Sequence, residues 1–173
     1  LQSERDIILR DLLALITAIS KDTYTGALIE KVMRVAAKAA SADGCFFFEI
    51  GQDKFMSLVY SNIKSLRERQ IGFDNLDFFE PIALSDIKNK AAKRPAEICA
   101  INREIINTDN IYKDDVIDTS FISGFDYKNN YATVSVLDLP LIDRKDNLIG
   151  VAQFLNAMDN NGKIINFTSD TVN

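Results

Sequence analysis

Residues 131–170 read YATVSVLDLPLIDRKDNLIGVAQFLNAMDNNGKIINFTSD, and this stretch decides the fold. An alternating apolar run extends from Ala132 to Leu139 and is interpreted as ending at Pro140, and a charged turn follows at residues 143–147. A second apolar run extends from Leu148 to Asn156. Two β-rich runs joined by a short polar loop are typical of a hairpin. The sequence therefore predicts two antiparallel strands here.

The sequence ahead of this hairpin predicts helices and short strands in alternation. Helical patterns occupy residues 4–20, Gly26–Ser41, Ile87–Lys93 (capped by Ser85 and Asp86) and Ala96–Glu104 (opened by Pro95). Further strands are predicted at Cys45–Ile50, Phe55–Tyr60, Phe78–Leu84 and Ile105–Asn107. Thr108–Tyr127 is expected to be a long polar loop with small helical turns. This order predicts an α+β fold, a central antiparallel sheet of five or six strands with the long helices on one face.

Composition limits the classes of partner. The 173 residues are 47% hydrophobic and 26% charged, as in one ordinary globular domain, and the net charge is −5. The acidic balance argues against nucleic acid, and the small basic cluster Lys88, Lys90, Lys93 and Arg94 is interpreted as a solvated helix face. No apolar run approaches the ~20 residues of a membrane-spanning helix. We expect no nucleic-acid or membrane partner for this fragment of a larger protein.

The reactive side chains are few. The sequence contains no histidine, which removes Ser-His-Asp and Cys-His catalysis, His-coordinated zinc and His-ligated haem. The two cysteines, Cys45 and Cys99, stand in apolar segments and are expected to be buried, reduced thiols of a cytoplasmic protein. We therefore expect no catalytic residue and no cofactor.

Carboxylates can form a metal site or an acid–base pair, and neither is indicated here. The four aspartates of the predicted loop lack the glycine and the glutamate of an EF-hand, so a solvated acidic loop is favoured over a cation site; they are Asp109, Asp114, Asp115 and Asp118. Asp138 is interpreted as an exposed strand position and Asp143 as a turn residue, not as partners in catalysis. No metal site is predicted.

Three segments resemble the GAF domain, a sensor module of phosphodiesterases, phytochromes and bacterial signalling proteins. Residues 28–50 (LIEKVMRVAAKAASADGCFFFEI) resemble the first helix and strand of that family. Residues 96–115 (AEICAINREIINTDNIYKDD) resemble its middle helix and following strand, and residues 139–157 (LPLIDRKDNLIGVAQFLNA) its closing hairpin. The resemblance extends from about Leu13 to Asp170.

The resemblance implies a pocket on the sheet face away from the long helices, roofed by short helices and loops. By segment matching, the ligand-binding candidates are Phe46, Ile98, Tyr112 and Thr133. An aromatic ring can stack on a planar ligand, and hydroxyl groups can donate and accept hydrogen bonds. The alternative that Phe46 and Ile98 are simply core residues stays open at this point.

The implied function is that of a non-catalytic small-molecule sensor regulating an attached output. Family outputs include cyclic-dinucleotide cyclases, HD-type phosphohydrolases, histidine kinases and adenylate cyclases. Asn156, Phe167 and Asp170 resemble part of a phosphodiesterase motif for cyclic-nucleotide retention, but Ala157 replaces its lysine. A cyclic nucleotide is therefore only one candidate ligand. The alternatives are a structural dimerisation module without ligand and a thiol-dependent free methionine sulfoxide reductase.

The apolar pattern of the expected N-terminal helix indicates a homodimer. Residues 4–20 carry two adjacent apolar stripes, wider than one domain surface covers. We expect a signalling and dimerisation helix at residues 1–20 and the sensor domain at residues 21–173. The homodimer stripe is Ile8, Leu12, Leu15 and Ile19. A single broad core-facing surface is the alternative.

Overall fold

The computed structural model describes residues 25–69, 79–89 and 94–168 of the chain. Its strands are β1 (Ala42–Ile50), β2 (Phe55–Ile63), β3 (Ile82–Ala83), β4 (Ile106–Thr108), β5 (Val136–Ile142), β6 (Leu148–Met158) and β7 (Ile164–Ile165). Its helices are α2 (Thr25–Ala39), α3 (Lys64–Glu68), α4 (Leu84–Asn89), α5 (Pro95–Asn102) and α6 (Ser120–Asn129), with a 3-10 turn η2 (Ile111–Lys113). The predicted helix at residues 4–20, including its dimer stripe, lies outside the described residues.

The strands form one antiparallel sheet. Six of them follow the order β3-β2-β1-β6-β5-β4, and each neighbouring pair is antiparallel. The short β7 pairs with β6 at Ala157 and Met158, beyond the last residue of β6 that pairs with β5. The predicted antiparallel sheet and its closing hairpin are therefore confirmed.

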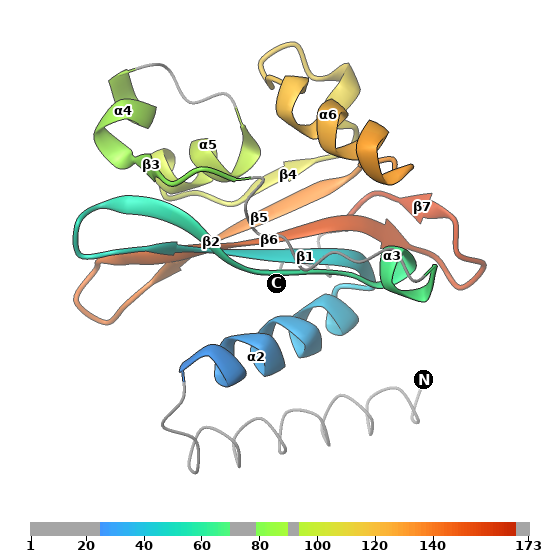
Figure 1. The fold of residues 1–173 in the computed structure, drawn as a ribbon, viewed down its shortest axis with the longest axis horizontal. Helices are drawn as coiled ribbons and strands as arrows, with labels where there is room; N and C mark the ends of the chain where they lie inside the picture. Colours follow the sequence, from blue (N-terminus) through green and yellow to red (C-terminus); the bar gives the residue numbers. More distant parts are fainter. Residues whose placement is uncertain (1–24, 70–78, 90–93, 169–173) are drawn as a thin grey trace.

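Helices cover both faces of the sheet (Figure 1). Helix α2 lies along one face, and α4, α5 and α6 lie over the other. This explains the six consecutive buried residues 43–48 of β1. Phe46 and Phe48 pack in the core under α5 and α6, whereas Cys45 and Phe47 pack in the core under α2. None of the helices within the described ranges is long and apolar enough to span a membrane.

Strand β5 differs from its predicted limits at both ends. It runs through Pro140, which pairs with Val151, and continues to Ile142. The proline is tolerated because β4 pairs with residues 136–138 of β5, and in the described part of the chain no strand flanks that edge at residue 140.

The start of β5 is set by Asn156. This residue has a φ of 54°, and its side chain replaces the ladder: Oδ1 accepts the Val134 N–H at 2.7 Å, and Nδ2 donates to the Ala132 carbonyl at 2.7 Å. Regular pairing of β5 therefore begins at Val136 and not at Ala132.

The middle of the chain is more helical than predicted. Among the described residues 79–84 of the expected strand Phe78–Leu84, Ile82–Ala83 pairs with β2. Helix α4 begins at once at Leu84, so Ser85 and Asp86 lie inside the helix. Most of the ten-residue helix α6 lies within the expected loop. The Asp118 side chain accepts the Ser120 N–H at 3.0 Å at its start. This hydrogen bond satisfies a donor at the helix N-terminus that has no intrahelical partner.

Candidate functional site

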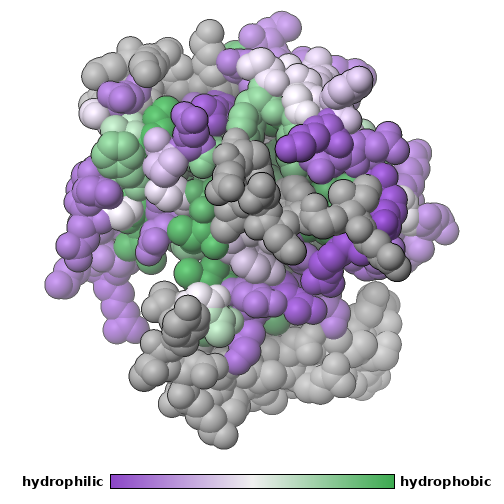
Figure 2. Space-filling model, viewed as in Figure 1, coloured by the Kyte–Doolittle hydropathy of each residue, from purple (hydrophilic) through white to green (hydrophobic). Residues whose placement is uncertain are grey.

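A cavity of about 40 Å³ lies between the sheet and helices α5 and α6. Its lining residues come from β1, β2, β5, β6, the two helices and the segments that precede β3, α5 and β5. In the space-filling view, hydrophobic side chains gather in the middle of the molecule and are bordered by hydrophilic ones (Figure 2). An apolar cavity with a few polar groups at its boundary is the usual form of a small-molecule site.

Phenylalanine rings form the wall of the cavity. Phe46 stands edge-on to Phe48 and to Phe125, with ring centroids 6.4 Å apart in both pairs. Phe79 lies 4.9 Å from Phe48 and 5.9 Å from Phe121. Tilted and edge-to-face pairs of this kind stabilise each other beyond their apolar burial. The rings therefore make a firm aromatic lining, to which the sheet and helix α6 both contribute.

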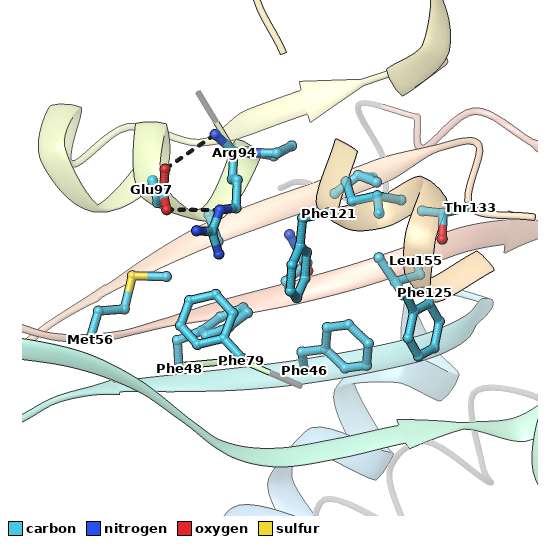
Figure 3. Close-up of a pocket in the computed structure, with 15 residues that line it drawn as sticks. Phe46, Phe48, Met56, Phe79, Arg94, Glu97, Phe121, Phe125, Thr133 and Leu155 are labelled. Atoms are coloured by element: carbon cyan, nitrogen blue, oxygen red, sulfur yellow. Dashed lines mark hydrogen bonds and ion pairs between the residues drawn. The ribbon is translucent and has the colours of Figure 1, made fainter. Parts of the chain in front are cut away.

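The charged side chains of the lining are Arg94 and Glu97. Arg94 caps α5, and its Nε lies 3.0 Å from Glu97 Oε1, while its backbone N–H donates to Glu97 Oε2 at 3.3 Å. Its guanidinium carbon lies 5.1 Å from the Phe79 ring centroid and 4.9 Å from that of Phe121. Figure 3 shows the guanidinium directed from the start of α5 toward the rings. The ion pair and the two rings together fix the position of this cation.

Thr133 brings a buried hydroxyl to the other side of Phe121 from Arg94 (Figure 3). Its N–H and its hydroxyl both donate to the Asp126 carboxylate, at 2.7 and 2.8 Å. The Tyr112 hydroxyl donates to the same carboxylate at 2.8 Å. Asp126 therefore ties helix α6 to the strand segment that lines the cavity.

Gln153 contributes a polar side chain from β6, opposite Asp138 of β5. The Gln153 amide donates to Asp138 Oδ1 at 2.9 Å, and Asp138 Oδ2 has no hydrogen-bond partner within the described residues. Burial raises the pKa of the Asp138 carboxyl well above its ordinary value, although the Gln153 hydrogen bond opposes this. Burial therefore favours the protonated, uncharged form of this carboxyl beside the amide. The prediction that Asp138 is exposed is wrong, because α5 covers this face of β5.

The four ligand-binding candidates predicted from the sequence fall into two pairs. Phe46 and Thr133 line the cavity. Ile98 is half-buried on α5 and does not line it. Tyr112 is 47% exposed and reaches Thr133 only through the Asp126 carboxylate.

Sequence reasoning found Thr133 but missed the other polar residues of the site. Arg94 was assigned to a solvated basic helix face, yet it caps α5 and its guanidinium borders the cavity. The available signal was the sequence Arg94-Pro95-Ala96-Glu97, in which a cation precedes a helix-opening proline and a carboxylate follows at the third helical position. Gln153 gave no signal beyond its place in an apolar strand.

The two thiols are poorly suited to catalysis. Cys45 and Cys99 are buried, as the sequence predicts, and they are not joined. Burial raises the pKa of Cys45 to about 12, with Arg34 opposing, and burial also raises the pKa of Cys99, with Asp138 adding to the shift. Reactive thiols are thiolates held by an exposed, electropositive environment. Neither cysteine has such surroundings.

The four aspartates between β4 and α6 are exposed. Asp114 and Asp118 accept the N–H groups of residues two positions later, as turn residues do. Within the ranges that the structure describes, no three metal-ligating side chains lie close enough to hold an ion.

The sequence matches no family model, and the search of curated proteins gives no match. Solved structures, in contrast, match along most of the chain. The GAF domain of the phosphoenolpyruvate-protein phosphotransferase from Acinetobacter is 16% identical, with a TM-score of 0.60 over 96% of this chain and 84% of that chain. The GAF domain/HD domain protein from Geobacter sulfurreducens is 13% identical, with a TM-score of 0.55 over 85% of this chain and 81% of that chain.

An enzyme has a similar fold. The free methionine-R-sulfoxide reductase from Neisseria meningitidis, solved in complex with its substrate, is 9% identical, with a TM-score of 0.60 over 97% of this chain and 78% of that chain. Identities this low show a shared fold, and fold alone does not imply function. The choice between a sensor and an enzyme therefore depends on the side chains of the site.

Proposed function

We propose that this chain, which has the fold of a GAF domain, is a non-catalytic small-molecule sensor that regulates an attached signalling output. The observation that carries the proposal is the cavity itself, with its wall of phenylalanine rings and its few fixed polar groups at Arg94, Thr133 and Gln153. Such a lining binds and orients a ligand, whereas it offers no nucleophile to transform one.

Thr133 connects the proposed ligand to the rest of the fold. It is held by Asp126 of α6, and the nearby Asn156 side chain accepts from Val134 and donates to the Tyr131 hydroxyl at 2.9 Å. A ligand that binds better when α6 is in one position shifts the population toward that position. The attached output would respond to that shift. We propose a cyclic-dinucleotide cyclase, an HD-type phosphohydrolase, a histidine kinase or an adenylate cyclase as the output.

The alternative of a free methionine sulfoxide reductase is supported by the shared fold alone. It would require a thiolate nucleophile, and the raised pKa values of Cys45 and Cys99 oppose this. The alternative of a structural dimerisation module would require a cavity that stays empty.

Two further parts of the proposal concern the whole protein. We propose a homodimer through the stripe Ile8, Leu12, Leu15 and Ile19, because burying each such side chain stabilises by about 1.5–3 kcal/mol. Sedimentation at high protein concentration tests this proposal, and a strict monomer would contradict it. We also propose a cytoplasmic location, which is consistent with two unpaired thiols.

A tryptophan placed in the pocket tests the sensor proposal, because the chain has no tryptophan of its own. Phe125→Trp puts the reporter in the cavity wall, and Tyr127→Trp puts it on the same helix at a side chain that is 92% exposed. Cyclic AMP, cyclic GMP, phenol, short-chain carboxylates and methionine sulfoxide are titrated against both variants. We expect at least one compound to change the emission of Phe125→Trp saturably and to leave Tyr127→Trp unchanged. No response from any compound would favour the structural module.

A further inference from the structure

The size of the cavity limits the proposed ligand. A volume of about 40 Å³ is small beside the roughly 300–1,000 Å³ of an ordinary small-molecule pocket. A cyclic nucleotide, with its base, ribose and phosphate, far exceeds this space. A short aliphatic chain fits it. The wall around it consists of phenylalanine rings and aliphatic side chains, so the buried part of the ligand must be apolar.

The charge at the boundary of the cavity indicates the polar part of the ligand. The Arg94 side chain is 31% exposed, so a group bound to it can remain at the mouth of the cavity while an apolar chain enters. Thr133 and Gln153 are neutral, and the Glu97 carboxylate is already engaged by the Arg94 Nε and backbone N–H. The remaining charge that a ligand can meet in this lining is the guanidinium.

The guanidinium of Arg94 offers a ligand one edge, that of Nη1 and Nη2. Nε faces Glu97, and the rings of Phe79 and Phe121 lie against the guanidinium carbon. Within residues 25–69, 79–89 and 94–168, the structure shows no hydrogen-bond acceptor for Nη1 or Nη2. A carboxylate matches this fork of donors with two parallel hydrogen bonds. Because Glu97 fixes the opposite edge, little side-chain freedom remains to be lost on binding.

We propose that the ligand of this pocket is a short-chain aliphatic monocarboxylate, with its carboxylate on the Nη edge of Arg94 and its alkyl chain among the phenylalanine rings (Figure 3). This inference rests on the proposed sensor function and specifies its ligand class. Arg94 selects for the negative charge, and the ring wall selects for a small apolar body.

Isovalerate and its neutral analogue isovaleramide test the proposal with Arg94 in place. The two compounds share the branched alkyl chain and differ in charge. Binding is followed by calorimetry and by the emission of Phe125→Trp. We expect isovalerate to bind at least about tenfold more tightly than isovaleramide, because a hydrogen-bonded charge contributes about 1.5–3 kcal/mol. Equal affinity for the two compounds would overturn the proposed ligand class.

Two arginines at opposite ends of α5 provide the matched variants. Arg94→Gln removes the charge at the pocket, and Arg103→Gln removes one that is paired with Asp146 at 2.8 Å instead. We expect Arg94→Gln to lose isovalerate affinity at least about tenfold and to lose far less of its isovaleramide affinity, with Arg103→Gln like the parent. Arg94→Lys, which keeps the charge without the fork, should fall between them.

The possible failures are distinguishable. If Arg94→Gln still binds isovalerate as the parent does, the carboxylate does not use Arg94 and the inference fails. If isovalerate does not bind while cyclic AMP or cyclic GMP changes the Phe125→Trp emission, the ligand class fails and the sensor function stands. If no compound binds, both fail. Should Arg94→Gln not fold, the comparison of isovalerate with isovaleramide on the parent chain decides alone.

Discussion

Asp126 and Thr133 are joined by two hydrogen bonds, one from the Thr133 N–H at 2.7 Å and one from its hydroxyl at 2.8 Å. Asp126 lies near the end of α6, and Thr133 lies in the segment that leads into β5. Both side chains are buried. This pair fixes the helix over the cavity, because it connects the roof directly to the polypeptide of the sheet.

The first prediction concerns this pair. Asp126→Asn should lower the free energy of unfolding by about 1.5–3 kcal/mol, because an amide cannot accept from the Thr133 N–H, its hydroxyl and the Tyr112 hydroxyl together. Tyr112→Phe removes one hydrogen bond from a half-exposed hydroxyl and should cost less than ~1 kcal/mol. Urea unfolding of the two variants measures both effects. Equal losses of unfolding free energy in the two variants would show that the Thr133 hydrogen bonds contribute no more stability than the Tyr112 hydrogen bond.

A second prediction concerns the close approach of β1 and β6 at Gly150. A Cβ at this position would lie 2.6 Å from the Phe48 carbonyl oxygen and 2.7 Å from the Phe47 ring. Gly150→Ala should therefore destabilise the fold by about 1–3 kcal/mol. Gly124→Ala in α6 is the matched control, since a Cβ there meets nothing within 4 Å and should stabilise the helix by ~0.5–1 kcal/mol. The unfolding temperature should fall for Gly150→Ala and rise for Gly124→Ala. A shift of the same sign in both variants would contradict the packing argument.

The third prediction is a pH dependence set by Asp138. Burial raises its pKa above the ordinary value of 3.8. At pH values between 3.8 and the raised pKa, the folded chain therefore holds a proton that the unfolded chain has released. The free energy of unfolding must then fall as pH rises through this window. Asp138→Asn keeps the acceptor for Gln153 and cannot ionise. We expect the variant to lose this slope and to be at least as stable as the parent at pH 7.

Asp143 serves as the control of opposite sign. Hydrogen bonds from the Asn147 side chain and backbone and from the Lys145 N–H lower the pKa of this exposed carboxyl. Its contribution is therefore present above pH 3.8 and is lost as pH falls through the lowered pKa. Asp143→Asn should be the less stable protein at neutral pH, with the difference disappearing in acid. For each variant, the difference in free energy of unfolding from the parent is followed against pH. If the two differences changed with pH in the same direction, the raised pKa of Asp138 would be contradicted.

The fourth prediction separates the sensor from the reductase. With a pKa of about 12, only ~0.01% of Cys45 is thiolate at pH 8, and Cys99 is also shifted upward. Both thiols should react slowly with an aromatic disulfide reagent in the native protein and rapidly in guanidinium chloride. Ser123→Cys, at an exposed position of α6, supplies a fast-reacting control. Methionine sulfoxide turnover that is abolished by Cys45→Ser or Cys99→Ser would overturn the non-catalytic assignment.

The sequence by itself determined the strands of the sheet centre. The runs at residues 45–50, 55–60 and 148–156 are apolar, flanked by turns and close to the observed β1, β2 and β6. A strand that is covered by helices on both faces needs a run of consecutive apolar residues, and such a run can be seen in the sequence without knowledge of its partners. The same local information located α5, whose first residue is Pro95. The resemblance to GAF domains followed from these segments in their order.

Tertiary structure alone decided the polar side of the site. Arg94 becomes a pocket residue because α5 lies over the sheet with its first turn beside Phe79 and Phe121. Asp138 is buried, and its pKa is raised, because the same helix covers its strand. Pro140 stays in β5 because the neighbouring strand ends before it. Each outcome depends on an element distant in sequence that packs against the residue, or on the absence of one. The local pattern of apolar and polar residues does not identify that element.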